Sequence, residues 1–130
     1  KALTLLILFT FKFFMTTLQH YLEIAKASLE KGDYKDALSK VLFGEACVRM
    51  DHPDLFTNPR MPLELLVIKG KAIGLGIIGE IESAKDYLAK GIYFMVKASL
   101  DNVEYYCGLA RLKVPEEVRE IRLKAITISN

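Results

Sequence analysis

The sequence predicts an all-α protein built from helical hairpins. Apolar residues recur every three or four positions over long stretches, which is the spacing of amphipathic helices. A pattern of glycine, acid, large apolar residue, two polar residues and alanine occurs twice, at residues 32–37 and 79–84. A pattern repeated in this way indicates stacked helical hairpins. The chain has 130 residues, enough for one domain with its own hydrophobic core.

The composition narrows the class of partner. The net charge is +2, and lysines and acidic residues are interspersed along the chain. No basic stripe of the kind that binds nucleic acid is present, so no nucleic-acid partner is expected. Two cysteines, Cys47 and Cys107, do not make a disulfide framework, and we expect reduced, partly buried thiols. A cytoplasmic location fits this cysteine usage.

Residues 1–17 form a hydrophobic segment that Lys12 interrupts. It has no small-residue cleavage site, and it is shorter than the roughly 20 apolar residues that cross a bilayer. Three interpretations stay open: an anchor or signal, a non-native extension upstream of Met15, and a helix packed on the domain. The helical domain is expected to comprise residues 18–130, with a membrane as partner only if residues 1–17 are an anchor.

The first two helices are expected at residues 18–31 and 34–50. Thr17 is a candidate N-cap of the first helix, and Gly32 ends it because glycine tolerates a left-handed backbone. Asp33 is the expected N-cap of the second helix, and Asp36 lies in its first turn.

Residues 51–62 contain three prolines, which excludes a continuous helix there. A third helix is expected at 63–78 behind Pro62 and a fourth at 80–100. Residues 101–104 resemble a capping box before a short fifth helix that ends near residue 112. A last helix is expected from Pro115 to about residue 126, with an acidic first turn that suits the helix dipole.

Residues 21–44 resemble a tetratricopeptide repeat. The matching residues are Tyr21, Ile24, Ala25, Gly32, Tyr34, Ala37, Val41 and Gly44. A weaker second copy comprises Ile68, Ala72, Leu75, Gly79, Ile81, Ala84, Leu88 and Gly91, with Lys71 where an apolar residue is expected. The resemblance implies two such hairpins plus C-terminal capping helices. The microtubule-interacting-and-trafficking domain, a three-helix bundle, uses a similar hairpin turn.

The resemblance implies a protein–protein interaction module that binds a peptide or partner helix in a groove. No catalytic residue, metal ligand or cofactor is expected, and the protein is not expected to be an enzyme. A mixture of lysines and apolar side chains suggests an acidic, partly apolar peptide. A self-associating homodimer that buries Ile73 and Ile77 is the alternative. The residues expected to line the groove are Gln19, Lys26, Glu30, Lys69, Ile73 and Ile77.

A third hypothesis is a dinucleotide-binding protein. Gly74, Gly76 and Gly79 form a G-x-G-x-x-G run, with candidate strands at 65–68 and 92–96. Lys69-Gly70-Lys71 interrupts the first candidate strand, which a buried parallel strand would not tolerate. The simpler interpretation is that Gly70, Gly74 and Gly76 thin a helix so that a neighbour packs closely.

Two further clusters are weak candidates for chemistry. Asp51, His52 and Asp54 follow one turn after Cys47, but their spacing matches no known metal site. Acids beside prolines are usually turn formers. Tyr105 and Tyr106 lie near Arg111 and Lys113, and we expect them to cover the end of the bundle rather than to stack on bases.

Overall fold

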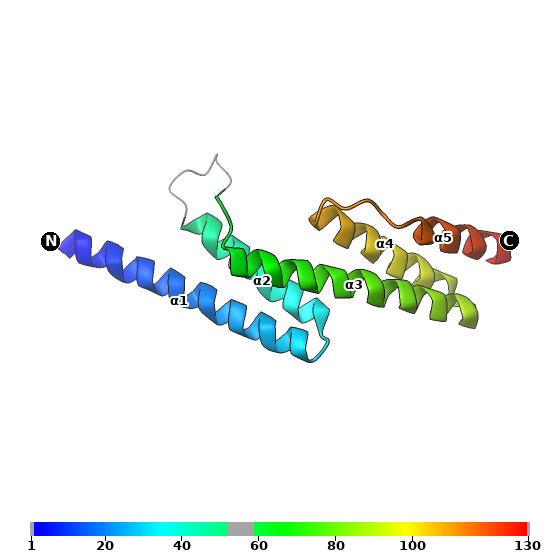
Figure 1. Ribbon diagram of the computed structural model, residues 1–130, viewed down its shortest axis with the longest axis horizontal. Coiled ribbons are helices and arrows are strands. Elements are labelled where there is room, and N and C mark those ends of the chain that lie inside the picture. The colour runs from blue at the N-terminus through cyan, green and yellow to red at the C-terminus, as the bar shows by residue number, and fades with distance from the viewer. Residues whose placement is uncertain (1, 52–58, 130) are drawn as a thin grey trace. The chain divides into compact units, whose positions relative to one another are not determined.

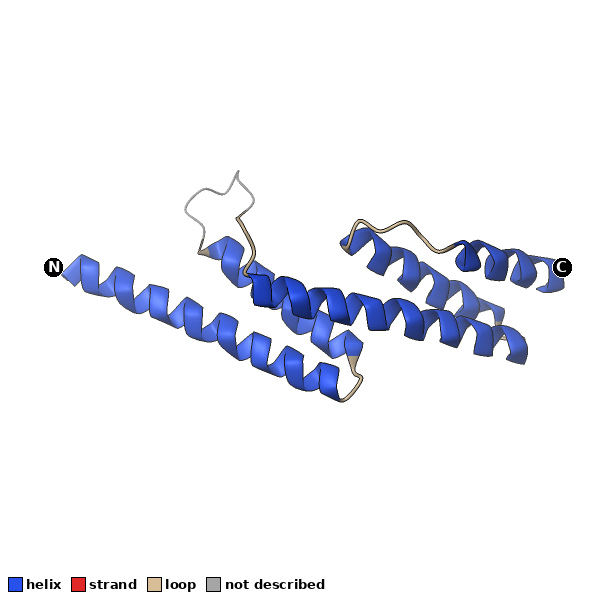
Figure 2. Ribbon diagram, in the orientation of Figure 1, coloured by secondary structure: helices blue, strands red, loops and turns tan. Residues whose placement is uncertain are grey.

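The computed structural model describes residues 2–51 and 59–129, without the side chains at 7–16 and 129. Five α-helices follow one another in these ranges, and no strand occurs in them (Figures 1 and 2). The prediction of an all-α fold is therefore confirmed. The helices are α1 (Ala2–Glu30), α2 (Tyr34–Met50), α3 (Leu63–Lys90), α4 (Tyr93–Leu109) and α5 (Glu116–Ser129).

The chain divides into two compact units, a first unit of Lys1–Ala72 and a second unit of Ile73–Asn130. The border falls inside α3, so this helix contributes its beginning to the first unit and its end to the second. The division expected at residue 17 has no counterpart in the secondary structure. Helix α1 continues through Thr17, and the expectation that a helix begins there is wrong.

The first unit contains the hairpin of α1 and α2 and the beginning of α3. Its core is formed by Leu22 and Ala25 of α1, Val41 of α2, and Leu65 and Ile68 of α3. Gly44 of α2 lets the helices approach closely. A Cβ atom at this glycine would lie 3.2 Å from the Cδ1 atoms of both Leu18 and Leu65.

The turn of this hairpin forms as the sequence predicts. Gly32 has a φ of +76°, and the amide of Asp33 donates to the carbonyl of Ser28 at 2.9 Å. This bond closes a Schellman-type helix end. Asp33 then caps α2, because its Oδ1 accepts a hydrogen bond from the Asp36 amide at 3.1 Å.

The second hairpin turn lies at Gly91 and not at Gly79. Gly91 has a φ of +74°, and the amide of Ile92 donates to the carbonyl of Tyr87 at 2.9 Å, which repeats the geometry at Gly32. The sequence carries this relationship as Leu-x-Lys-Gly-x-Tyr, which occurs at residues 29–34 and again at 88–93. The repeat pairing that placed Gly79 in a turn is wrong, because α3 continues without a break through it.

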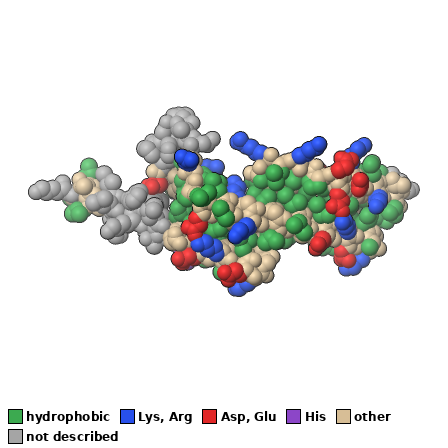
Figure 3. Space-filling view, viewed as in Figure 1, with side chains coloured by type: hydrophobic (Ala, Val, Ile, Leu, Met, Phe, Trp, Pro, Cys, Tyr) green, Lys and Arg blue, Asp and Glu red, His purple; other side chains and the backbone are tan. Residues whose placement is uncertain are grey.

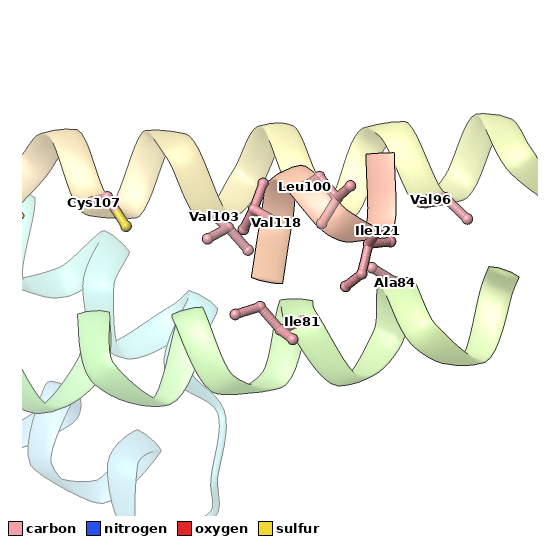
Figure 4. Packing of buried hydrophobic residues seen from close by; sticks show 8 residues of the cluster. All are labelled: Ile81, Ala84, Val96, Leu100, Val103, Cys107, Val118 and Ile121. Atoms are coloured by element: carbon pink, nitrogen blue, oxygen red, sulfur yellow. The ribbon is translucent and has the colours of Figure 1, made fainter. Parts of the chain in front are cut away.

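The core of the second unit brings three helices together (Figure 4). Its largest fully buried side chains include Leu100 and Val103 of α4 and Val118 of α5. Burial raises the pKa of the Cys107 thiol, and the nearby Glu104 raises it further. The cluster comprises Ile81 and Ala84 from α3, Val96, Leu100, Val103 and Cys107 from α4, and Val118 and Ile121 from α5.

The strand–glycine–helix arrangement expected for dinucleotide binding is wrong. Gly74, Gly76 and Gly79 all lie inside α3, and both candidate strands, 65–68 and 92–96, are outside any sheet. Residues 65–68 belong to α3 and residues 93–96 to α4. A glycine run that receives a pyrophosphate must join a strand to the start of a helix, and here it does not.

Two further helix boundaries need correction, and two are confirmed. Residues 101–104 lie within α4 and do not start a separate helix. The fourth helix, expected from residue 80, begins at Tyr93. The beginnings of α3 behind Pro62 and of α5 behind Pro115 are confirmed, and α5 has the expected acidic first turn.

Candidate functional site

The candidate site is an apolar pocket between α4 and α5, within the second unit. Its volume is about 300 Å³, and its floor includes Val96 and Leu100, which are completely buried or nearly so. Ile126 lies at the edge, with 57% of its surface exposed. Concave apolar pockets with a few polar groups are the usual form of binding sites. The pocket is lined by Tyr93, Val96, Lys97, Leu100, Arg122, Ala125 and Ile126.

The two helices place these residues by their periodicity. The lining residues of α4 lie three or four positions apart, which is the spacing of one helix face. They are Tyr93, Val96, Lys97 and Leu100. On α5, Arg122 and Ala125 are three residues apart. Core contacts of Val118 and Ile121 fix α5 beside α4, so the pocket depends on the same packing that builds the second unit.

Two cations line the pocket, and each is held by a carboxylate. Arg122 of α5 donates to Asp101 at 2.8 Å and to Glu104 at 2.7 Å, both on α4. Lys97 donates to the other Asp101 oxygen at 3.0 Å. Lys97 and Arg122 are among the lining residues, whereas Asp101 and Glu104 are not. The pocket lining therefore includes both positive groups and neither of the carboxylates that pair with them.

These bonds shift the protonation equilibria of the network. The hydrogen bond from Arg122, followed by that from Lys97, lowers the pKa of Asp101 below its usual value of 3.8. Partial burial lowers the pKa of the Arg122 guanidinium, but its bonds to Asp101 and Glu104 outweigh burial and raise the pKa overall. Both shifts favour the charged forms, so the pairing stabilises Asp101 as a carboxylate and Arg122 as a cation.

Hydrophobic side chains gather on the second unit beside positive ones. On the face that Figure 3 shows, green hydrophobic surface forms a patch over this unit, and Lys and Arg side chains project at its edges. Exposed large hydrophobic residues of α4 and α5 include Phe94, Tyr105, Leu123, Ile126 and Ile128. An apolar surface of this kind, rimmed by polar residues, is typical of interaction sites.

The six residues predicted to line a groove are not all exposed. Gln19, Lys26 and Glu30 are exposed on α1, as expected. Ile73 is only 2% exposed, and Ile77 is half-buried against the core of the second unit. The expectation that Ile73 is exposed is wrong, because it lies on a packed face of α3. Ile73 therefore offers no exposed surface to the expected homodimer, and self-association itself stays a prediction.

The two predicted groove lysines are engaged in ion pairs within the first unit. Lys26 of α1 pairs with Glu64 of α3, and Lys69 of α3 pairs with Glu45 of α2. Glu45 is buried, so a carboxylate introduced at position 69 would destabilise the fold besides altering any groove. Whether these six residues bind a partner stays a prediction.

Neither the acidic loop cluster after Cys47 nor the tyrosine pair at 105–106 forms a complete site among the described residues. His52 and Asp54 lie outside the described residues, and within those residues no group of three His, Cys, Asp or Glu side chains is placed to hold a metal ion. Tyr106 is buried and Tyr105 exposed, with tilted rings 5.8 Å apart. Burial, and then Glu80 and Tyr105, raise the pKa of Tyr106. Only Tyr105 of this pair is therefore open to a partner.

Sequence reasoning missed the α4–α5 pocket. It ended a helix at residue 100, which separated Lys97 from Asp101 and from the pocket that α4 forms with α5. The available signal was the opposite charge at positions 97 and 101, a spacing that favours an ion pair on one continuous helix.

Comparisons with known proteins do not assign the chain to a family. No protein-family model matches the chain, and neither a curated protein nor a solved structure matches it significantly. Among the described residues, no helix combines the length and the apolar character that a membrane span requires. The resemblance to tetratricopeptide repeats stays a prediction.

Proposed function

We propose that this chain is a protein-interaction module that holds a large apolar side chain of a partner peptide or helix in the α4–α5 pocket. The observation that carries the proposal is the pocket itself, about 300 Å³ in volume over an apolar floor. This volume is at the small end of ligand sites, which span roughly 300 to 1,000 Å³. It therefore suits one anchoring side chain better than a whole cofactor.

The charges at the pocket favour an acidic residue beside that anchor. Lys97 and Arg122 line the pocket, while Asp101 and Glu104 do not. A partner carboxylate would meet Lys97 first, because this side chain is the more exposed of the two cations. Its bond to Asp101 is an exposed helix pair that contributes only about 0.3–0.5 kcal/mol, so exchange of partners costs little.

A reducing compartment such as the cytoplasm is part of the proposal. Cys47 and Cys107 both carry free thiols, and Cys107 lies in the core of the second unit. Free thiols are the common state of cysteines in reducing compartments. The proposed partner is another protein, with no nucleic acid and no cofactor.

Selection from a random peptide library displayed on phage tests the proposal. The full chain serves as bait, and we expect a consensus with one large apolar residue next to Asp or Glu. Ala125→Phe fills the pocket from α5, and we expect it to lower the affinity of the selected peptides at least tenfold. Isothermal titration calorimetry with a synthetic consensus peptide measures this change.

Ala98→Phe is the matched control, since Ala98 is exposed on α4 and does not line the pocket. We expect the control to bind the peptide as the unaltered chain does. Circular dichroism of both variants confirms that the helices remain. Peptides that bind both variants equally, or a library that yields no consensus, would contradict the proposal.

A further inference from the structure

The middle of α3 is unusually rich in glycine. Gly70, Gly74, Gly76 and Gly79 lie within ten residues of one continuous helix. Glycine is the least favourable helix residue after proline, because its backbone loses the most conformational freedom on becoming helical. A helix that keeps four glycines in its middle needs a physical reason for them.

Close packing is not the reason at two of these positions. A Cβ atom added at Gly70 or at Gly74 would meet nothing within 4 Å. The contrast is Gly44, where the added atom would lie 3.2 Å from two leucine side chains. The expectation that Gly70 and Gly74 thin the helix for a neighbour is therefore wrong, and at both sites the open space leaves the backbone accessible to water.

The same stretch lies where the two compact units of the chain join. The border between Ala72 and Ile73 falls between the two open glycines. The core cluster of the first unit ends along α3 at Ile68, and that of the second begins at Ile81, with Ile77 packed against it. Ala72 and Ile73 are buried but belong to neither cluster.

We propose that residues 70–79 make α3 a hinge between the two units. Water can hydrate the carbonyl groups on the open face at Gly70 and Gly74, which lengthens their helical hydrogen bonds and bends a helix convex towards solvent. A bend of this sense opens the face that carries Gly70 and Gly74, and it keeps Ala72, Ile73 and the buried Gly76 inside. It changes the orientation of one unit to the other without disturbing either core.

Distance measurements between spin labels at the two ends of α3 test the hinge. The labels are placed at Leu63→Cys and Ala89→Cys, both exposed positions, in a chain whose Cys47 and Cys107 are replaced by alanine. A straight helix separates these positions by about 39 Å, at about 1.5 Å per residue. We expect the labelled chain to show a broad distribution that extends to shorter distances.

The double substitution Gly70→Ala and Gly74→Ala should narrow this distribution to one peak near the straight-helix value. The same variant should slow amide hydrogen exchange in residues 70–79 by about tenfold, because alanine disfavours local opening. Gly108→Ala is the matched control, since its added Cβ also meets nothing within 4 Å but lies in α4. It should leave both readouts of α3 unchanged.

Two outcomes would overturn the hinge. One is a single narrow distribution already present in the chain with all four glycines. The other is a dimer, detected by light scattering, that the double substitution dissociates while the distance distribution stays the same. In that case the glycines would allow close contact with a helix of a second copy of the chain, and they would not be there for bending.

Discussion

Lys69 of α3 and Glu45 of α2 form a buried ion pair, with 2.5 Å between the lysine Nζ and the glutamate Oε1. Only 5% of the Glu45 side chain and 19% of the Lys69 side chain are exposed. Arg49 approaches the second glutamate oxygen at 3.8 Å. The pair ties α3 to the hairpin of the first unit, and it occupies a lysine that sequence reasoning assigned to a binding groove.

Replacing Lys69 with methionine should therefore destabilise the first unit by about 3 kcal/mol, because it leaves a buried carboxylate without its main partner. Urea unfolding followed by circular dichroism measures the loss. The double variant Lys69→Met with Glu45→Leu should recover most of it, since two well-packed apolar residues can replace a buried pair. Equal stability of the single and double variants would contradict this expectation, because removing Glu45 would then relieve no unpaired buried charge.

Gly44 and Gly70 should respond in opposite ways to the same substitution. Gly70→Ala should raise the free energy of unfolding by about 1 kcal/mol, the difference in helix propensity at an open site. Gly44→Ala should lower it by a similar amount, because the new methyl group overpacks Leu18 and Leu65. Chemical denaturation of the two variants side by side checks the signs, and stabilisation by Gly44→Ala would mean that these leucines move aside.

Arg111 ends α4 in a conformation that glycine adopts at the other two turns. Its φ is +54°, and the amide of Leu112 donates to the carbonyl of Cys107 at 2.8 Å, as in the turns at Gly32 and Gly91. A side chain in the left-handed region costs roughly 1–2 kcal/mol. Arg111→Gly should accordingly raise the melting temperature by roughly 3 °C.

Lys113→Gly is the control for that substitution, because Lys113 lies in the same connection but has no positive φ. It should lower the melting temperature slightly, since glycine only adds freedom to the unfolded chain. Differential scanning calorimetry measures both variants. A fall in melting temperature for Arg111→Gly would show that the arginine side chain contributes more than its backbone strain costs.

Acidification should weaken the link between α4 and α5 through Asp101. Hydrogen bonds from Arg122 and Lys97 lower its pKa in the folded chain below 3.8. A carboxyl group with a depressed folded pKa stabilises the fold above its unfolded pKa, and this contribution is lost as the pH falls through the folded value. The loss attributable to Asp101 should therefore appear below about pH 4.

Urea midpoints at pH 5 and pH 2.5 measure this contribution. Asp101→Asn should lose less stability between the two pH values than the unaltered chain does. Asp86→Asn removes the carboxylate of an exposed pair with Lys90 and serves as the control. If the two variants show the same dependence on pH, the Asp101 network does not stabilise the second unit in the proposed way.

The hairpin turns show which helix boundaries the local sequence could predict. Asp33 follows Gly32 and caps α2 with its side chain, so the beginning of α2 could be predicted from the sequence. The structure confirms it. Glu80 behind Gly79 offers the same local signal, yet α3 continues there because Ile81 and Ala84 pack in the core of the second unit. At Gly91 the following Ile92 makes no side-chain cap, and the signal was too weak to be recognised.

Periodicity and turn chemistry by themselves determined that this protein is all-α, and they located the first hairpin and the beginnings of α3 and α5. These features depend on residues close together in the chain, whose preferences do not need a partner helix. Tertiary packing alone decided that α3 runs unbroken past its glycines, that Ile73 is buried, and that Lys69 is committed to Glu45. It also decided the α4–α5 pocket, because which apolar faces meet across a fold is set by distant residues and not by local spacing.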